Sequence, residues 1–255
     1  MKLLEFIGRG ILDLLEDFGR FVVLSWQTLR GVFRPPYDFR SWAAQFVRVG
    51  VDSVPVVFLT ALFTGGVLAL QTYNGLQRVH GEAYVGSIVA ISMLRELAPV
   101  LTGLMVAGRA GSAMAAELGS MRVTEQIDAL VTLATDPVQY LFVPRVIAGI
   151  LVMPLLVTLA DATGIFGGYL VATKVLGANP VVYVSNSFQF LVLKDLFSGL
   201  IKSAVFGGLL AVIGCQRGFD TKGGAEQVGR STTSAVVTGS LAILISDFFL
   251  TKVLF

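Results

Sequence analysis

Residues 146–172 read VIAGILVMPLLVTLADATGIFGGYLVA, and the only charged side chain among them is that of Asp161. About 20 consecutive apolar residues are enough for a helix to cross the hydrocarbon core of a bilayer, which is roughly 30 Å thick. The quoted stretch is long enough, and it carries Gly and Pro inside it, as membrane helices permit. It therefore predicts a transmembrane helix.

Four further stretches share this length and this lack of charge. They cover about residues 51–73, 86–108, 196–215 and 235–254. The composition agrees, because 55% of the 255 residues are hydrophobic and only 14% are charged, whereas an average soluble domain carries about 25% charged residues. The sequence therefore predicts an all-α membrane protein, with five transmembrane helices in one domain that covers residues 51–255.

An amphipathic region, residues 1–50, precedes the first span. Apolar side chains recur there at steps of three or four residues, with charges between them. They are Leu4, Ile7, Ile11, Leu14, Phe18 and Phe21. The pattern favours a helix that lies in the membrane interface, although a helix packed on soluble protein has the same period. Pro35 and Pro36 should end it, and a second short amphipathic piece with Trp42 and Phe46 leads into the first span.

Lys and Arg are divided unevenly between the two sides of the predicted spans. They are frequent before the first span, after the second and after the fourth, whereas the opposite side has only Arg78, Lys174, Lys194 and Lys252. The positive-inside rule then places the N-terminus in the cytoplasm. Five spans place the C-terminus on the outer side.

A short separate helix is expected between the second and third spans, at about residues 124–135. Thr124 suits the N-cap, and Glu125 suits the positive first turn. Its apolar face is formed by Ile127, Leu130 and Val131. The segment is too short to span a bilayer, and the charge rule places it in the cytoplasm. There it could enter the groove of a partner protein or pack on its own chain, and periodicity alone does not separate the two.

The sequence lacks the motifs that several kinds of functional site require. No G-x-x-x-x-G-K-[ST] loop is present, so the chain cannot cradle ATP phosphates in that way. One histidine, His80, cannot form a His-based metal cluster within one chain. The single cysteine, Cys215, excludes an internal disulfide. There is no basic run with interleaved aromatics, so nucleic acid is not an expected partner.

Short motifs from about residue 45 onward are more specific in combination than singly. They are Leu94-Arg-Glu-Leu-Ala-Pro99, Ala107-Gly-Arg-Ala-Gly-Ser-Ala113, Ala116-Glu-Leu-Gly119, Met121-Arg122, Thr124-Glu-Gln126, Asp136-Pro137, Pro144-Arg145, Leu200-Ile-Lys-Ser203 and Gly229-Arg-Ser-Thr-Thr233. With this set the chain resembles the MlaE family, the permeases of ABC lipid transporters that work with MCE-domain proteins.

The resemblance implies a permease subunit that passes phospholipid or another lipid between the membrane and an MCE-domain protein on the outer face. It implies a homodimer, often with a small cytoplasmic accessory subunit. It also implies a separate cytoplasmic ABC ATPase, docked on the helix at about 124–135 through Glu125, Ile127, Leu130 and Val131. The chain itself would then be no enzyme and hold no cofactor, since ATP binds the ATPase. The expected location is the cell inner membrane, although plastid members exist.

Charged side chains at membrane depth are the candidate site. They are Arg95, Glu96, Asp161, Lys202 and Asp247. A charge at a helix centre costs about 2.5–3.5 kcal/mol, so it usually faces a cavity or a partner. The resemblance favours a lipid cavity lined by all of these except Asp161, for which a structural role is expected. The alternative is a set of buried ion pairs that hold the helices together. Tyr73, at the outer end of the first span, is a weaker cavity candidate, since it could be an ordinary interfacial aromatic.

Two other functional classes stay open. An intramembrane aspartyl protease could use Asp161 and Asp247, which would have to share a proton, but neither has the usual Gly-x-Gly-Asp context. An ion-coupled secondary transporter often has internal repeats, and the sequence has no evident repeat. An ATPase that co-purifies with the chain would distinguish the permease from both.

Overall fold

The structure is a computed structural model that describes residues 2–35 and 38–255, without the side chains of residues 2–7, 9–11, 13, 14 and 79. All regular structure in these residues is helical. Five continuous helical stretches among them are long and apolar enough to cross a membrane. We call these rods 1 to 5: Phe39–Leu76, Glu82–Val123, Val138–Val175, Leu193–Phe219 and Ala225–Leu254. Each contains one predicted span, which confirms the all-α membrane fold with five spans.

Rods 1 to 3 change their helical winding along their length, whereas rods 4 and 5 are the single helices α10 (Leu193–Phe219) and α11 (Ala225–Leu254). Rod 1 contains α2 (Phe39–Val49), the 3-10 turn η1 (Val51–Ser53) and α3 (Val54–Leu76). Rod 2 contains η3 (Glu82–Tyr84), α4 (Val85–Ser92), η4 (Met93–Leu97), α5 (Ala98–Val106), η5 (Ala107–Gly111) and α6 (Ser112–Val123). Rod 3 contains η6 (Val138–Phe142), α8 (Val143–Leu170) and η7 (Val171–Val175). The segments η4 to η7 are π-helical.

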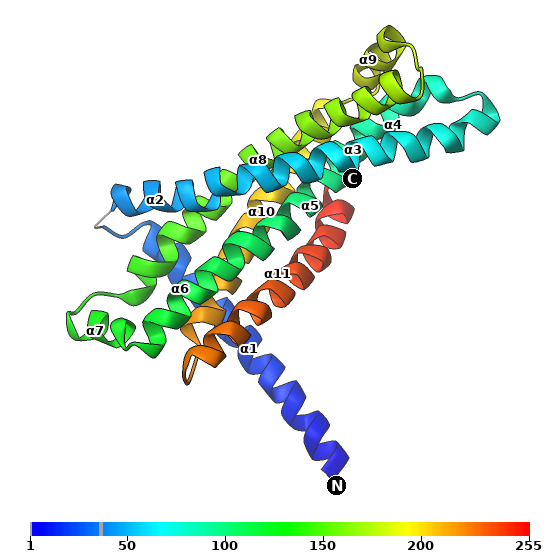
Figure 1. Cartoon of the computed structure of the whole chain (residues 1–255). Helices are drawn as coiled ribbons and strands as arrows, with labels where there is room; N and C mark the ends of the chain where they lie inside the picture. Colours follow the sequence, from blue (N-terminus) through cyan, green and yellow to red (C-terminus); the bar gives the residue numbers. More distant parts are fainter. Residues whose placement is uncertain (1, 36–37) are drawn as a thin grey trace.

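The N-terminal helix α1 (Lys2–Val32) has the extent predicted for the amphipathic helix. Of its predicted apolar stripe, Phe18 is exposed and Phe21 packs against the core. The side chains of Leu4, Ile7, Ile11 and Leu14 lie outside the described part, as does Pro36. The first half of α1 extends away from the bundle in Figure 1.

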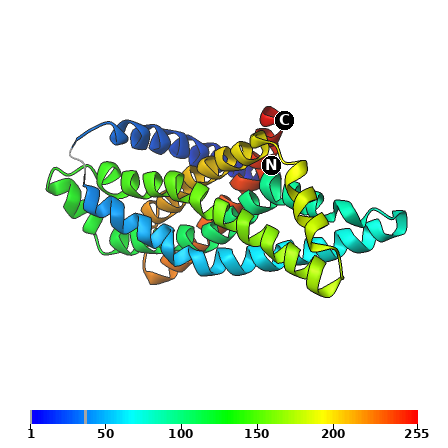
Figure 2. The ribbon, with the colours of Figure 1, turned by 90° about the horizontal axis from the view of Figure 1, so that it is seen from above.

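Two ion pairs attach the middle of α1 to the end of α10. Asp17 lies 2.9 Å from Arg217, and Arg20 lies 3.3 Å from Asp220. Arg20 also pairs with Glu16 on its own helix. These contacts hold α1 along one side of the bundle, while α2 and α3 follow the other side (Figure 2).

The helix α8 lies at the centre of the bundle, with α3 and α10 packed against it. Of its most apolar window, 72% is buried, against 17% for α11 at the periphery. Glycines make the central crossings close: a Cβ added to Gly65 of α3 would collide with the carbonyl of Gly164 on α8. Gly149 of α8 and Gly207 of α10 meet in the same way. Small residues let membrane helices approach backbone to backbone, so these contacts set how the rods pack.

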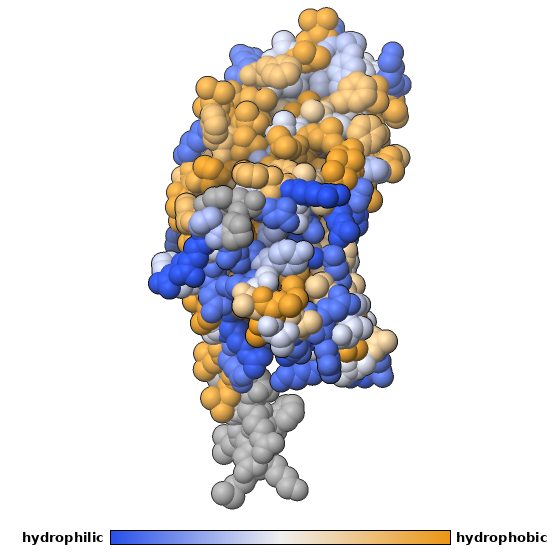
Figure 3. All heavy atoms as spheres, turned by 90° about the vertical axis from the view of Figure 1, so that its left-hand side faces the viewer, coloured by the Kyte–Doolittle hydropathy of each residue, from blue (hydrophilic) through white to orange (hydrophobic). Residues whose placement is uncertain are grey.

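The two ends of the bundle differ in character. The short helix α7 (Gln126–Thr132) lies at one end, and α9 (Pro180–Gln189) lies at the other (Figure 1). Apolar residues dominate the upper part of the face in Figure 3, and hydrophilic residues become frequent lower down. The end with α7 is the one that the loop charges assign to the cytoplasm.

The helix α9 was not predicted from the sequence. Asn179 caps it, since its side-chain oxygen accepts hydrogen bonds from the amides of Val181 at 2.9 Å and Val182 at 3.4 Å. Pro180 at the first helical position has the backbone angle that a helix needs. The Asn179-Pro180 pair was therefore the available signal for this helix.

The α3–α8 crossing yields the first prediction. Gly65→Ala should destabilise the protein by about 1–3 kcal/mol, because the new methyl group overpacks a backbone contact. Gly75→Ala on the same helix is the matched control, since nothing lies within 4 Å of its Cβ position, and it should be neutral or stabilising by roughly 0.5–1 kcal/mol. Thermal melting in detergent compares the two. Equal melting temperatures for both variants would show that the crossing is not this tight.

Candidate functional site

The ammonium of Lys202 on α10 is the centre of an ionic cluster inside the bundle. Its side chain is 0% exposed. It donates hydrogen bonds to Glu96 Oε2 at 2.8 Å and Thr251 Oγ1 at 2.7 Å, and it lies 3.0 Å from Asp247 Oδ1. Because these partners come from η4 and α11, one side chain connects rods 2, 4 and 5. A charge without access to water is tolerated only with such pairing.

The third hydrogen bond of Lys202 goes to a backbone carbonyl that a proline leaves without its usual donor. Pro99 has no amide hydrogen, so the carbonyl of Arg95, four residues earlier, lacks its normal helical donor. Lys202 Nζ donates to this carbonyl at 3.1 Å. An ammonium has three N–H groups, and they are now all used. This explains why Asp247 Oδ1 contacts the ammonium as a charge pair without an aligned hydrogen bond.

The π-helical segment η4 places Arg95 and Glu96 on rod 2. The amide of Ala98 bonds to the carbonyl of Met93, five residues earlier, which widens the turn. Such π-bulges are rare and are often found at functional sites. The sequence did not predict the bulge, although Pro99 marks its place.

Arg95 is held by a carboxylate that the sequence analysis did not select. Its Nε and Nη2 atoms each lie 2.7 Å from Oδ1 of Asp195, which is buried at the start of α10. The other oxygen of Asp195 accepts the amide of Val192 at 3.1 Å and so caps the helix. The guanidinium also lies over the ring of Phe255, 4.5 Å from its centroid. Asp195 was missed because it lies one residue outside the predicted span.

The charged residues predicted for a cavity thus come together in one cluster. We call Arg95, Glu96, Asp195, Lys202 and Asp247 the charge cluster. Glu96 is 39% exposed, as is Arg95, and Asp247 is 18% exposed. Lys202 has no accessible surface and faces only its partners. With two cations and three carboxylates, the cluster has a formal charge of −1.

Two predicted residues lie on other helices than the cluster. Tyr73 is on α3, partly buried against the core. Asp161 is buried on α8, and its Oδ1 atom has no hydrogen-bond partner among the described residues. Asp247 is paired with Lys202 rather than with a second aspartate. A protease that needs two aspartates sharing a proton is therefore disfavoured.

The helix predicted at about 124–135 is shorter and begins differently. Its helical part, α7, covers Gln126–Thr132. Thr124 is not its N-cap, because its hydroxyl donates to the carbonyl of Ser120 at 2.8 Å and closes α6. Glu125 precedes the helix in a left-handed conformation, with φ of 58°. It forms the sharp turn between α6 and α7 and does not lie in the first turn.

The structure divides the residues predicted to form one apolar face of α7. Ile127 is fully buried and Leu130 is partly buried, both packed within the chain. Val131 is 57% exposed, and Leu133 just beyond the helix is also exposed. A partner could therefore contact Val131 and Leu133 together with Glu125, but not Ile127.

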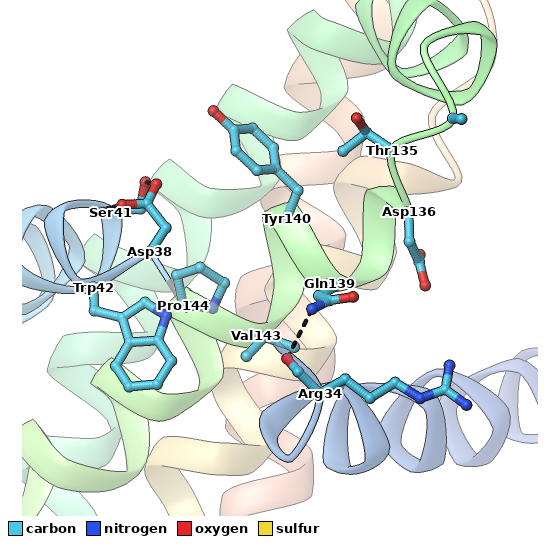
Figure 4. A pocket seen from close by; sticks show the side chains of 12 residues that line it. Arg34, Asp38, Ser41, Trp42, Thr135, Asp136, Gln139, Tyr140, Val143 and Pro144 are labelled. Carbon is cyan, nitrogen blue, oxygen red and sulfur yellow. Dashed lines mark hydrogen bonds between the residues drawn. The ribbon is translucent and has the colours of Figure 1, made fainter. Parts of the chain in front are cut away.

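A hollow of about 400 Å³ lies beside this region. It is formed by the end of α1, the start of α2 and the segment that follows α7 (Figure 4). Gln139 bridges two of these parts, since its side-chain amide donates to the carbonyl of Arg34 at 2.9 Å. Hydrogen bonds from Ser41 lower the pKa of Asp38, another lining residue. Its carboxylate therefore stays charged near neutral pH.

An ion network joins α6 to the neighbouring rods. Glu117 lies 2.9 Å from the buried Arg145 of α8 and 3.0 Å from Arg48 of α2. Arg109 of η5 donates to Ser53 Oγ at 2.8 Å and to the carbonyl of Arg48. The helix that leads into α7 is thereby fixed to rods 1 and 3.

Five apolar rods, charges buried between them and a short helix at one end define a multi-pass membrane protein of the permease class. Comparison with known proteins gives the family: the model of Permease MlaE matches residues 42–253. The chain belongs to the MlaE permease family.

Relatives from bacteria and plants align with most of the chain. It is 46% identical to a probable ABC transporter permease protein of Rickettsia bellii, over 98% of this chain and 96% of the relative. It is 36% identical to the intermembrane phospholipid transport system permease protein MlaE of Haemophilus influenzae, over 98% of this chain and 96% of the relative. It is 38% identical to the chloroplastic protein TRIGALACTOSYLDIACYLGLYCEROL 1 of Arabidopsis thaliana, over 91% of this chain and 67% of the relative.

The second prediction concerns Lys202. Lys202→Met should destabilise the protein by about 3–5 kcal/mol, because it strands Glu96 and Asp247 next to each other without a cation. Adding Glu96→Gln and Asp247→Asn should restore much of the loss. Lys252→Met, at an exposed position of α11, is the control and should melt like the wild type. If Lys202→Met also melted like the wild type, the ammonium would not be holding the rods together.

Proposed function

We propose that this chain is the permease subunit of an ABC transporter for phospholipid or a related lipid. The observation that carries the proposal is the charge cluster, where Glu96, Arg95 and Asp247 remain partly exposed inside otherwise apolar rods. Exposed charge at membrane depth is costly unless it meets water, a partner or a polar ligand. The relative from Haemophilus influenzae, named as a phospholipid transport permease, supports a lipid as that ligand.

The cluster has complementary groups for a zwitterionic headgroup. Asp195 engages Nε and Nη2 of Arg95, so Nη1 can donate to a phosphate oxygen. Glu96 can accept from an ammonium group of the lipid, and such charge-assisted hydrogen bonds are the strong ones. Lys202 stays out of contact with the lipid and fixes the positions of Glu96 and Asp247. Tyr73, partly buried on α3, stays a weaker candidate for contact with the lipid.

The remaining parts of the transporter follow from the same proposal. A separate cytoplasmic ATPase binds ATP, since this chain has no phosphate-binding loop. An MCE-domain protein lies on the outer face, and a small accessory subunit can join in the cytoplasm. The homodimer is supported by α11, whose apolar surface is the least covered of the five rods in the described chain. Its exposed residues include Val237, Leu241, Leu244, Phe248 and Phe249.

The proposed location is the cell inner membrane. The distribution of Lys and Arg supports a cytoplasmic N-terminus and an exported C-terminus. The amphipathic region, residues 1–50, would lie in the cytoplasmic interface, and residues 51–255 would form the permease domain. ATP hydrolysis in the partner makes this chain a transport subunit and not an enzyme.

Glu96→Gln tests the lipid site. The amide can still accept from Lys202, and Asp247 still neutralises it, so melting should stay close to that of the wild type. Lipid transfer should fall about tenfold, which corresponds to a loss of about 1.4 kcal/mol. Reconstituted transfer assays and mass spectrometry of co-purified lipid measure the effect. Glu226→Gln, an exposed carboxylate on α11, is the control. Unchanged transfer by Glu96→Gln would remove the cluster from the lipid path.

Val131→Asp tests the ATPase contact. The side chain is exposed, so the change should leave folding intact but put a charge into an apolar contact, with a loss of ATPase binding of at least tenfold in pull-down assays. The control is Gln77→Asp, at an exposed position toward the end of the bundle opposite α7. If both variants retained the ATPase equally, the docking surface would lie elsewhere than at α7.

A further inference from the structure

The helix α9 has two faces of opposite character. Tyr183 and Ser187, one turn apart, are buried against the bundle. Val181, Val184 and Phe188 recur at helical spacing on the other side and are exposed, Val181 by 76% and Phe188 by 66%. No helix of the described chain covers this second face.

The position of α9 against the bundle is well defined. A Cβ at Gly86 of α4 would come within 2.5 Å of Ser187 Oγ and 2.7 Å of the carbonyl of Tyr183, so the two helices touch through a glycine. Ser87 Oγ donates to the carbonyl of Asn186 at 2.8 Å, and the Asn186 amide donates to the carbonyl of Ala83 at 2.7 Å. These contacts fix the orientation of α9, so its apolar face points away from the bundle.

The sequence around α9 lacks charge. Residues 176–193 contain no Asp, Glu, Lys, Arg or His, whereas Lys174 and Lys194 flank them on both sides. Basic side chains at the edges of an apolar segment are typical of the membrane interface, where they reach toward the headgroups. A helix exposed to water on one face would normally carry polar residues there.

The two rods that precede and follow α9 in the sequence also carry exposed apolar residues. Phe166 on α8 and Phe197 on α10 are exposed apolar residues near the same end of the bundle. The contacts of α9 with Ala83 and Gly86 lie within the first two turns of rod 2. At about 1.5 Å per residue these contacts are roughly 2–6 Å from the start of the rod at Glu82. The span predicted for rod 2 begins at about residue 86, so α9 packs against the outer end of that span.

We propose that α9 is an interfacial anchor, with Val181, Val184 and Phe188 inserted among the upper acyl chains of the outer leaflet. The occupant of the apolar face is lipid rather than protein, because the uncharged segment is bounded on both sides by lysines, Lys174 and Lys194, which are placed to reach the headgroups. Amphipathic helices bind in this way with the apolar face buried about 5–10 Å into the boundary of the headgroups. This proposal does not depend on which molecule the protein transports.

The test uses single cysteines in the full-length chain, purified with its partner subunits. Cys215 is buried, so Cys215→Ser gives a background without a reactive thiol. Bimane is attached at Phe188→Cys or Val181→Cys, and at Gln189→Cys as the polar control on the same helix. The labelled proteins are placed in vesicles of phosphatidylethanolamine and phosphatidylglycerol that contain a lipid with a nitroxide at the fifth acyl carbon. Melting temperatures check that each variant is folded.

Bimane at positions 188 and 181 should be quenched by the nitroxide lipid at least twofold more than at position 189, and it should be protected from iodide in the aqueous phase. Stronger quenching by iodide at 188 and 181 would mean that the face lies in water and would overturn the proposal. Protection from both quenchers would mean that a protein subunit covers the face, which would also overturn it.

Discussion

The ammonium of Lys202 has no access to water and must be neutralised by the protein itself, and the arrangement of three rods follows from this. The groups that meet it are the carbonyl of Arg95 and the side chains of Glu96, Asp247 and Thr251. One of these acceptors, the carbonyl of Arg95, has no amide donor four residues later because residue 99 is proline. The π-helical turn of η4 and Pro99 therefore belong to the same arrangement as the buried lysine. Lys202 of rod 4 donates a hydrogen bond to the carbonyl in rod 2 that lacks a helical donor.

The sequence was sufficient to predict the five spans and four of the five charges of the cluster, because both depend on how little charge the apolar stretches contain. It could not predict which charges pair. Lys202 could have met Asp161 or Asp247, and the choice depends on how each helix is rotated about its axis. For α8 and α10 that rotation is fixed by backbone contacts such as Gly149 on Gly207, which arise only in the packed structure. Asp195 was missed because it lies just outside a predicted span, where charged residues are common and do not indicate a site.

The short helix between rods 2 and 3 shows where capping rules reach their limit. A threonine hydroxyl can accept an amide at the start of a helix, or it can donate to a carbonyl four residues earlier at the end of one. Thr124 does the second. Ile127, Leu130 and Val131 keep helical spacing within α7, and their burial decreases across that side of the helix. Ile127 is buried in the core, Leu130 is partly buried and Val131 is exposed. Ile127 therefore packs on its own chain, as one interpretation expected, whereas Val131 is free to contact a partner protein, as the other expected.

Rod 2 has ionic or hydrogen-bonded contacts with each of the other four rods. At its α6 end, Glu117 pairs with Arg48 of rod 1 and Arg145 of rod 3. At η4, the charge cluster connects it with rods 4 and 5. Only Thr124 and Glu125 separate α6 from α7, so a displacement of α7 is not absorbed by a linker and reaches rod 2 directly. Between these two ionic contacts lies the π-helical segment η5, where the helical hydrogen bonding departs from the regular i→i−4 pattern. Arg109 in this segment bonds to Ser53 of rod 1, so rod 2 is attached to its neighbours at three places along its length. The contact at η4 is the most costly of the three to break, because Lys202 is fully buried and separating it from its carboxylates would cost several kcal/mol. A movement of α7 is therefore expected to carry rods 2, 4 and 5 together at the charge cluster.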